Sequence, residues 1–390
     1  MTPTPVTFAS PTAPAAYSWE ATDEQIAARY GVPIEDIVRF DLNTSPAPPA
    51  LAQRLLAAGR FEAALSEYPP TDYRRLVHAA AARYGVGTDE VLVGAGADEI
   101  LDIIAKAFLP AGAAAVVPTP TYAMYRIITE QRAASALIVP RLNAEAGYAL
   151  DLPAVREAAR SAAVVWLCSP NNPTALPEPD GAIETLLADL ATDAGDAGDA
   201  RDPDVGDRPA PIVVLDEAYA EFVGHSLVAL METYPNLVVV RTASKAYALA
   251  GLRVGFALAR PEVIARLDPY RPPGSVSTVS VTIVTEALLD ARVLEANLDR
   301  VTRERARLSD GLTAAGWSVG PSVTNFVLVD FASPERAAAV AKTLLRRGLV
   351  PRTFGATHPL ADHLRLTVRD PHENDRLLDA AHAIGSKLPT

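Results

Sequence analysis

A lysine with an informative set of neighbours follows one of the apolar runs of the sequence. Lys245 stands in TASKAYALAGLRVGF, just after the run 237–240, together with Ser244 and Arg253. Most single lysines are solvated surface charges, so the neighbours carry the argument here. An amine at the carboxyl end of a strand lies where α/β proteins gather their sites, and it can form a Schiff base with an aldehyde.

Asp216 stands in an equivalent place, at the end of the apolar run 212–215 and the start of DEAYAEF. By itself it is more simply explained as an aspartate that caps a helix. A carboxylate at the tip of a buried strand also needs a cationic partner to offset its desolvation. A protonated ring nitrogen of a ligand would supply that partner.

A third stretch, VLVGAGADEI, runs from the apolar residues 91–93 through Gly94 and Gly96 into an expected helix. Free backbone N–H groups at a helix start suit a phosphate dianion, and Ser244 and Arg253 would add a hydroxyl and a guanidinium. A plain tight turn explains this stretch equally well.

Amine, acid and phosphate donors are what pyridoxal 5′-phosphate (PLP) requires of a protein, along with a planar group against its ring. Asn172, in CSPNNPT, and Tyr219 could both reach the 3′ oxygen of the ring, and Tyr122 could stack on its face. Each of these residues also has an ordinary role in a turn or in packing. Their combination predicts a PLP site.

Seven short apolar runs alternate with helical stretches. This pattern predicts an α/β fold with a seven-stranded, mostly parallel sheet covered by helices. The runs are 91–93, 115–117, 136–139, 164–167, 212–215, 237–240 and 254–258. A helix is expected over 23–30. One long amphipathic helix is expected over 281–315, with Glu304 among the residues on its solvent side.

The C-terminal part predicts a small α+β domain, with strands near 325–329 and 363–368 and helices near 334–347 and from about 373. The predicted organisation is an N-terminal arm and helix over 1–45, a large PLP-binding domain over 46–275 and a small domain over 276–390. Within the large domain, residues 191–211 are rich in Asp, Gly and Ala and predict an exposed, poorly ordered loop.

The composition narrows the class of protein. The chain has 390 residues, 49% of them apolar, a formal net charge of −12 and one cysteine, Cys168. The charge disfavours nucleic acid and anionic membranes as partners, since no basic patch is evident. No apolar run is long enough to span a bilayer, and one cysteine fits a reducing compartment, so we expect a cytoplasmic protein. We expect Cys168 to be packed within a strand, and we assign no metal ligands.

Three motifs in order, NNPT at 171–174, DEAY at 216–219 and SKAYALAGLRVGF at 244–256, resemble those of the class I/II PLP aminotransferases. GADE at 96–99 and PTYAMY at 120–125, with LRLTV at 364–368, resemble the histidinol-phosphate aminotransferase branch. The resemblance covers the chain from about residue 41 onward. It implies an aspartate-aminotransferase-like large domain and a small C-terminal domain.

The resemblance also implies roles for the cofactor contacts. Lys245 would be the Schiff-base lysine and proton shuttle, and Asp216 the partner of the ring nitrogen. The 3′ oxygen would be bound by Asn172 and Tyr219. The phosphate and the ring face would be held by Ser244, Arg253, the backbone of Ala97 and Asp98, and Tyr122.

For the substrate, the resemblance implies that Arg365, in HLRLTV, binds the α-carboxylate through its bidentate fork. Arg352 would lie near a distal phosphate of the substrate, and Asn43, in LNTSPAPP, would line the substrate entrance. Tyr68, in EYPPTDY, would cross to the phosphate of a neighbouring subunit. The implied assembly is a homodimer with shared sites.

Three positions depart from the family pattern. Ala175 replaces the glycine of NPTG, which is tolerated if the backbone there avoids positive φ. LNTSPAPP at 42–49 replaces the more common LNENPxGP and alters the substrate entrance. LTVRDPHEND carries Arg369 where the aminotransferase branch usually has glycine, and this segment resembles that of the threonine-phosphate decarboxylases.

The implied reaction moves an amino group between an amino acid or amino-alcohol phosphate, such as histidinol phosphate, and a 2-oxo acid such as 2-oxoglutarate. A PLP-dependent decarboxylase of the threonine-phosphate type is the alternative, because the same residues serve if the Cα–carboxylate bond stands perpendicular to the ring. A non-catalytic PLP domain of a bacterial regulator predicts a DNA-binding module, and residues 1–40 contain no helix-turn-helix pattern.

Overall fold

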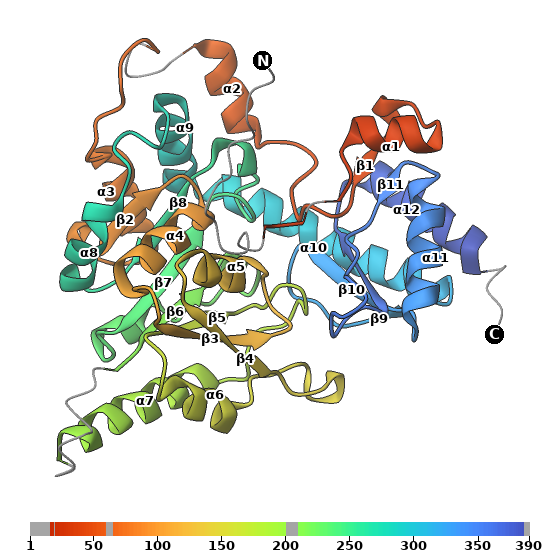
Figure 1. Cartoon of the computed structure of the whole chain (residues 1–390). Helices are drawn as coiled ribbons and strands as arrows, with labels where there is room; N and C mark the ends of the chain where they lie inside the picture. Colours follow the sequence, from red (N-terminus) through yellow and green to blue (C-terminus); the bar gives the residue numbers. More distant parts are fainter. Residues whose placement is uncertain (1–15, 19, 60–64, 200–209, 386–390) are drawn as a thin grey trace, which may run out of the picture.

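The computed structural model describes residues 16–18, 20–59, 65–199 and 210–385 of the chain. These residues form a large seven-stranded sheet and a small three-stranded sheet. Figure 1 shows the two sheets on either side of the long helix α10 (Ala291–Ala314). Functional groups from distant parts of the chain can therefore meet between them.

The large sheet confirms the predicted α/β fold class. From edge to edge its strands are β2 (Val91–Gly94), β8 (Gly255–Leu258), β7 (Leu237–Thr242), β6 (Ile212–Asp216), β5 (Val164–Cys168), β3 (Ala114–Thr119) and β4 (Ser135–Pro140). Only β8 pairs in the antiparallel sense, with β2 and β7. All seven predicted apolar runs coincide with these strands.

The large sheet is buried on both faces, because alternate residues of its strands point into two separate cores. Val213 and Leu215 pack into the first core and Val214 into the second. The first core is covered by α2 (Ala50–Ala58), α3 (Arg74–Tyr84), α6 (Leu152–Ala159), α7 (Ala182–Asp199) and α9 (Thr278–Leu289). The second is covered by α4 (Ala97–Phe108), α5 (Met124–Gln131) and α8 (Pro261–Leu267).

The parallel strands end at one edge of the sheet. Cys168, Asp216 and Val240 lie side by side in register on β5, β6 and β7. The loops beyond β5 and β7 carry Asn172 and Lys245. This edge is where open α/β sheets place their ligands.

The small sheet has the strand order β12 (His363–Thr367), β10 (Phe326–Asp330) and β9 (Ser318–Val319), and it packs with α11 (Pro334–Leu345) and α12 (Pro371–Gly385). The predicted helix over 23–30 is present as α1 (Asp23–Tyr30). β1 (Val38–Arg39) then pairs with β11 (Leu349–Val350), so this N-terminal segment joins the small-sheet side (Figure 1). The domain boundaries after residues 45 and 275 stay predictions.

The single helix expected over 281–315 is wrong, because the chain breaks between α9 and α10. Asp290 leaves the helical region with φ −103° and ψ 95°, and its side chain accepts a hydrogen bond from the Arg292 N–H as an N-cap. Glu304 is also buried rather than exposed, since its carboxylate accepts a 2.9 Å hydrogen bond from Asn374 Nδ2 of α12.

The loop expected over 191–211 is wrong in its first half, because α7 continues to Asp199. Asp193 receives two hydrogen bonds of 2.9 and 2.6 Å from Arg156 of α6, and this pair fixes the helix against its neighbour. The alanines of the stretch also favour a helix. Residues 200–209 lie outside the described residues.

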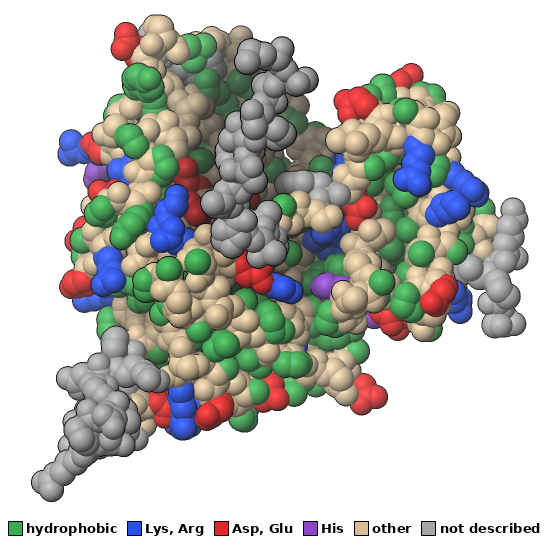
Figure 2. Space-filling model, in the orientation of Figure 1, with side chains coloured by type: hydrophobic (Ala, Val, Ile, Leu, Met, Phe, Trp, Pro, Cys, Tyr) green, Lys and Arg blue, Asp and Glu red, His purple; other side chains and the backbone are tan. Residues whose placement is uncertain are grey.

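Charge is mixed on the face of the molecule shown in Figure 2, where acidic and basic side chains are interspersed. No helix in the described part of the chain combines the length and the apolar character that a bilayer crossing requires.

Candidate active site

A cavity of about 420 Å³ opens at the carboxyl edge of the large sheet. All predicted site residues except Tyr68 line it: Asn43, Ala97, Asp98, Tyr122, Asn172, Asp216, Tyr219, Ser244, Lys245, Arg253, Arg352 and Arg365. The cavity also includes residues that the sequence did not assign to a site: Tyr17, Asp41, Leu42, Thr44, Cys168, Ala218, Thr242 and Ala250. Cys168 is buried in β5, as expected for strand packing.

Lys245 extends into this cavity from the loop after β7. Its Nζ donates to the Asn43 carbonyl at 3.3 Å and lies 5.8 Å from the centre of the Tyr219 ring. Burial, followed by the positive charge of Arg365, lowers the pKa of the Lys245 amine from 10.5 to about 8. About half of the amine is therefore neutral at pH 8, in the form that a nucleophile or proton acceptor requires.

Asp216 presents a buried carboxylate beside the amine. Its Oδ1 accepts from the Ala218 N–H at 3.0 Å and its Oδ2 accepts from the Tyr125 hydroxyl at 2.8 Å. Burial raises the pKa of Asp216 to about 6, although both hydrogen bonds act in the opposite direction. Such a carboxylate gains from a cationic partner in the cavity.

A second polar group joins the two sheets across the cavity. Arg365 of β12 donates to Asn172 Oδ1 at 2.6 Å and to the Asp41 carbonyl. Its Nε is buried and has no hydrogen-bond partner among the described residues. Asn43 donates from Nδ2 to the Tyr219 hydroxyl at 2.9 Å. Burial raises the pKa of that hydroxyl, so it stays protonated and able to donate.

The start of α4 forms a third group, and it has the features of a phosphate site. The helix has no side-chain cap at Gly96, so its first N–H groups are open to a ligand. A Cβ on Gly96 would lie 2.5 Å from Arg253 Nη2, so glycine allows the guanidinium to lie against the turn. Asp98 contacts Arg253 at 3.3 Å and accepts from the Tyr122 hydroxyl at 2.9 Å.

Three features of the cavity fit PLP. An amine of lowered pKa, a buried carboxylate and an uncapped helix start beside a guanidinium occupy one cavity, and the residues that form them come from the ends of adjacent strands. Lys245 would hold the aldehyde carbon, Asp216 the ring nitrogen, and Ser244 and Arg253 the phosphate.

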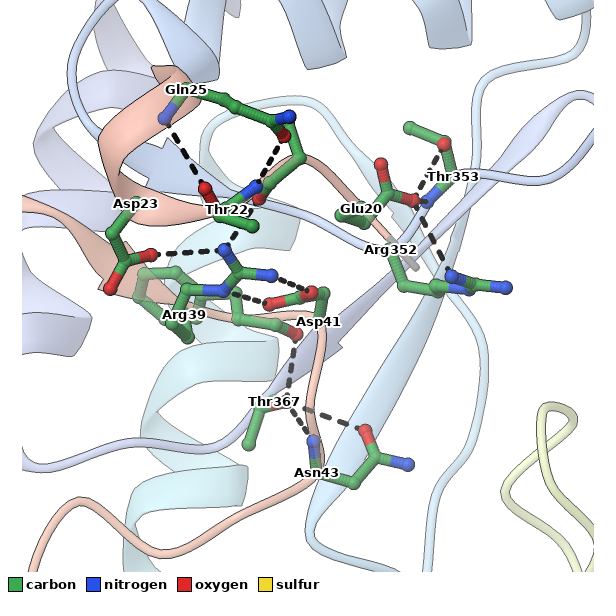
Figure 3. Close-up of polar contacts among 12 residues, drawn as sticks. Glu20, Thr22, Asp23, Gln25, Arg39, Asp41, Asn43, Arg352, Thr353 and Thr367 are labelled. Carbon is green, nitrogen blue, oxygen red and sulfur yellow. Dashed lines mark hydrogen bonds and ion pairs between the residues drawn. The ribbon is translucent and has the colours of Figure 1, made fainter. Parts of the chain in front are cut away.

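Residues near the N-terminus that the sequence did not assign to the site lie beside the cavity, and Tyr17 is among the residues that line it. Arg352 Nη1 donates to the Ser18 carbonyl at 2.8 Å and lies 3.8 Å from the Glu20 carboxylate, as drawn for Glu20 in Figure 3. The Arg352 guanidinium also lies 5.5 Å from the centre of the Tyr17 ring. Tyr17 follows a Pro- and Ala-rich stretch, and an aromatic residue there was the only signal available.

Figure 3 also shows how the chain after β1 is fixed to the small sheet. The Thr367 hydroxyl of β12 accepts from the Asn43 N–H at 2.9 Å, and Arg39 holds Asp41 through hydrogen bonds of 2.9 and 2.6 Å. These contacts place Asn43 at the cavity wall.

Tyr68 lies outside the cavity, and its side chain is 92% exposed. A residue that acts across a subunit interface would be exposed in one protomer, so its proposed role stays a prediction.

The structure places two of the positions that depart from the family pattern. Ala175 has a φ of 67° and is fully buried, so the condition that its backbone avoids positive φ is not met. Arg369 makes two 3.0 Å hydrogen bonds to Glu373 and is not among the residues that line the cavity in the described part of the chain. Arg369, the position at which the sequence resembles the threonine-phosphate decarboxylases, therefore lies outside the described lining of the cavity.

Comparisons with known proteins agree with this geometry. The family model described as aminotransferase class I and II matches residues 39–191 and 207–380. The histidinol-phosphate aminotransferase of Symbiobacterium thermophilum is 37% identical over 90% of this chain and 91% of its own length. That of Roseiflexus castenholzii is 36% identical over 91% of this chain and 92% of its own.

Among solved structures, the histidinol-phosphate aminotransferase of Sinorhizobium meliloti in complex with PLP superposes with a TM-score of 0.81. It is 25% identical, and the match covers 95% of this chain and 96% of that one.

Proposed function

The chain belongs to the class I and II aminotransferases, which use PLP, and we propose that its amino donor is an amino-alcohol phosphate of the histidinol-phosphate type. The reaction partners of the family are an amino donor and a 2-oxo acid. The relatives with 36–37% identity that carry this substrate in their names support the proposal. The observation that carries it is a pair of arginines in the cavity.

Arg352 and Arg365 are neighbours across an antiparallel bridge, with backbone hydrogen bonds of 3.0 and 3.1 Å. Arg365 is 7% exposed, and Arg352 stands nearer the mouth with a side chain that is 18% exposed. Two guanidinium groups suit a phosphate dianion or a dicarboxylate. One pair of arginines can therefore serve the phosphorylated donor in the first half-reaction and 2-oxoglutarate in the second.

Lys245 is the residue that we assign to the proton at the substrate Cα. Its lowered pKa leaves a neutral amine, which can take that proton and later return it. Bound PLP would supply an electron sink for the negative charge that develops at Cα. Asp216 would keep the ring nitrogen protonated, and Asn172 and Tyr219 would donate to the 3′ oxygen.

The remaining contacts would hold and orient the cofactor. The N–H groups of Ala97 and Asp98 at the start of α4, with Ser244 and Arg253, would bind the phosphate. Tyr122, whose hydroxyl is fixed by Asp98, would cover the ring.

We further propose a cytoplasmic homodimer in which Tyr68 reaches the phosphate of the partner's site. Mixing Lys245→Ala with Tyr68→Phe tests this arrangement. A hybrid dimer would contain one site with both native residues, so the mixture should be more active than either variant alone. Activities that only average would argue against shared sites.

The substrate test is an absorbance experiment on the PLP-loaded protein, mixed anaerobically and without 2-oxo acid with histidinol phosphate, phosphothreonine, an aromatic amino acid or glutamate. The proposal expects histidinol phosphate to convert the cofactor stoichiometrically to pyridoxamine phosphate. Conversion by the aromatic amino acid alone would replace the proposed donor. Release of carbon dioxide from phosphothreonine, with the cofactor band unchanged, would favour the decarboxylase.

A further inference from the structure

Tyr125 contacts the Asp216 carboxylate but is not among the described residues that line the cavity. Its ring is fully buried, and its hydroxyl donates to Asp216 Oδ2 at 2.8 Å. The other carboxylate oxygen accepts from the Ala218 N–H at 3.0 Å. Each oxygen is thus held by one donor from the protein, which restricts rotation of the carboxylate.

The position of the Tyr125 hydroxyl is itself fixed by packing. The ring stacks on Trp166 of β5 with 5.7 Å between the ring centres and 6° between the planes. The Thr129 hydroxyl donates to the Tyr125 carbonyl at 2.7 Å and accepts from Trp166 Nε1 at 3.1 Å. These contacts leave the hydroxyl little freedom to move away from Asp216.

We propose that Tyr125 is a positioning residue, whose hydroxyl orients the Asp216 carboxylate toward the ring nitrogen of PLP and keeps it ionised. The inference rests on the proposed role of Asp216 as the partner of that nitrogen. A carboxylate oxygen accepts more than one hydrogen bond, so an oxygen held by Tyr125 or Ala218 still has a lone pair for the cofactor. Tyr125 does not line the cavity among the described residues, and its ring packs edge-on against Tyr122 with 5.7 Å between the ring centres. Tyr125→Phe keeps that ring contact, so it tests the hydroxyl, which contacts Asp216.

The charges around Asp216 show what the hydroxyl contributes. The titratable groups that interact with the carboxylate come from every element around it: Tyr125 from α5, Cys168 from β5, Asp98 from α4, Tyr219 from the segment after β6 and Lys245 from the loop after β7. Burial and Asp98 raise the pKa of Asp216, whereas the Tyr125 hydroxyl, the Ala218 N–H and Lys245 lower it. Without the hydroxyl the carboxylate would bind a proton more readily and would stabilise a protonated ring nitrogen less.

The experiment uses holoenzyme loaded with PLP that carries ¹⁵N in its ring. The ¹⁵N chemical shift of the ring nitrogen is followed against pH, and the PLP dissociation constant is measured by equilibrium dialysis. For Tyr125→Phe we expect the ring nitrogen to lose its proton about one pH unit lower, and PLP to bind roughly 10-fold more weakly.

Tyr84→Phe is the matched control. It removes the same atom, and the Tyr84 hydroxyl is buried without a hydrogen-bond partner among the described residues. This variant should titrate and bind PLP as the native protein does. Urea unfolding of the two apoproteins reports whether both variants fold.

Asp216→Asn separates the inference from the proposed function. If the ring nitrogen keeps its proton in Asp216→Asn, the assigned role of Asp216 fails. If Asp216→Asn loses the proton but Tyr125→Phe behaves like the native protein, only the inference about Tyr125 is overturned. In the Asp216→Asn background, Tyr125→Phe should change the PLP dissociation constant less than about twofold, because the hydroxyl acts through the carboxylate. A 10-fold increase of the PLP dissociation constant in that background would show that Tyr125 acts through packing and not through Asp216.

Discussion

The cavity has two ends that are built in different ways. The cofactor end, with Lys245, Asp216 and Asn172, lies at the tips of parallel strands that are buried on both faces. The substrate end, with Arg352 and Arg365, depends on contacts between segments as distant as residues 18 and 352. Under the proposed function, the cofactor end would set the chemistry through residues that local strand structure positions. The substrate end would set the choice of donor through residues whose positions depend on how the N-terminal segment and the small sheet meet.

The largest expected effect is on the cofactor end. Lys245→Ala should slow transamination by roughly 10⁴-fold for every donor, because the proton at Cα loses its acceptor. Single-turnover absorbance with several donors measures this loss. Lys106→Ala is the control, since Lys106 pairs with Asp102 on α4 outside the cavity and should leave the rate unchanged. A loss confined to one donor would contradict the division between the two ends.

At the substrate end, Arg352→Gln should lower kcat/KM for a phosphorylated donor by roughly 10- to 100-fold, the range expected for one charged hydrogen bond. Its PLP dissociation constant should not change. Steady-state kinetics with phosphorylated and non-phosphorylated donors measure the difference. Arg336→Gln, at an exposed position of α11, is the matched control. An equal loss for both kinds of donor would show that Arg352 does not discriminate between them.

The buried amine should also make apoprotein stability depend on pH. The pKa of Lys245 is about 8 when folded and ordinarily 10.5, so between these values the unfolded chain binds the proton and the folded chain does not. Native stability therefore rises with pH in this window. Lys245→Met should be the more stable protein at pH 7, and its advantage should shrink from pH 8 to 10.5. Urea unfolding across this range checks the sign, and a constant difference would contradict it.

The smallest effect concerns Ala175, which packs with Ala218 and Tyr219 of the cofactor end. With a φ of 67° the alanine is strained, so Ala175→Gly should raise the free energy of unfolding by up to about 1 kcal/mol. Urea unfolding measures it. Ala341→Gly, within α11, should instead lower the free energy of unfolding by about 1 kcal/mol. Destabilisation by Ala175→Gly would show that its buried methyl group outweighs the strain.

The same contrast explains how far the sequence could be interpreted. Each of the seven strands of the large sheet contains an uninterrupted apolar run. Asp216 directly follows the run 212–215, and Asn172 and Lys245 stand in the loops that follow the runs 164–167 and 237–240. Local pattern was therefore enough to predict the cofactor end and the fold class. The family resemblance supplied Arg352, Arg365 and Asn43, whose positions no local pattern determines.

What the sequence did not predict depends on contacts between distant residues. The place of Tyr17 at the cavity follows from Arg352, and the continuation of α7 follows from the Arg156–Asp193 pair. The break at Asp290 occupies one residue, which a helical periodicity does not reveal. Glu304 is charged and yet buried because Asn374 and Arg307 satisfy its carboxylate.

The carbonyl of Asn43 accepts hydrogen bonds from both Lys245 Nζ at 3.3 Å and Asn325 Nδ2 at 3.0 Å. The amine thus shares an acceptor with the small-sheet side, and burial, followed by the charge of Arg365 on that side, lowers its pKa. If the small sheet moved away, the lysine would become more basic and take up a proton. A substrate that contacts both sheets would keep the amine in the environment that lowers its pKa.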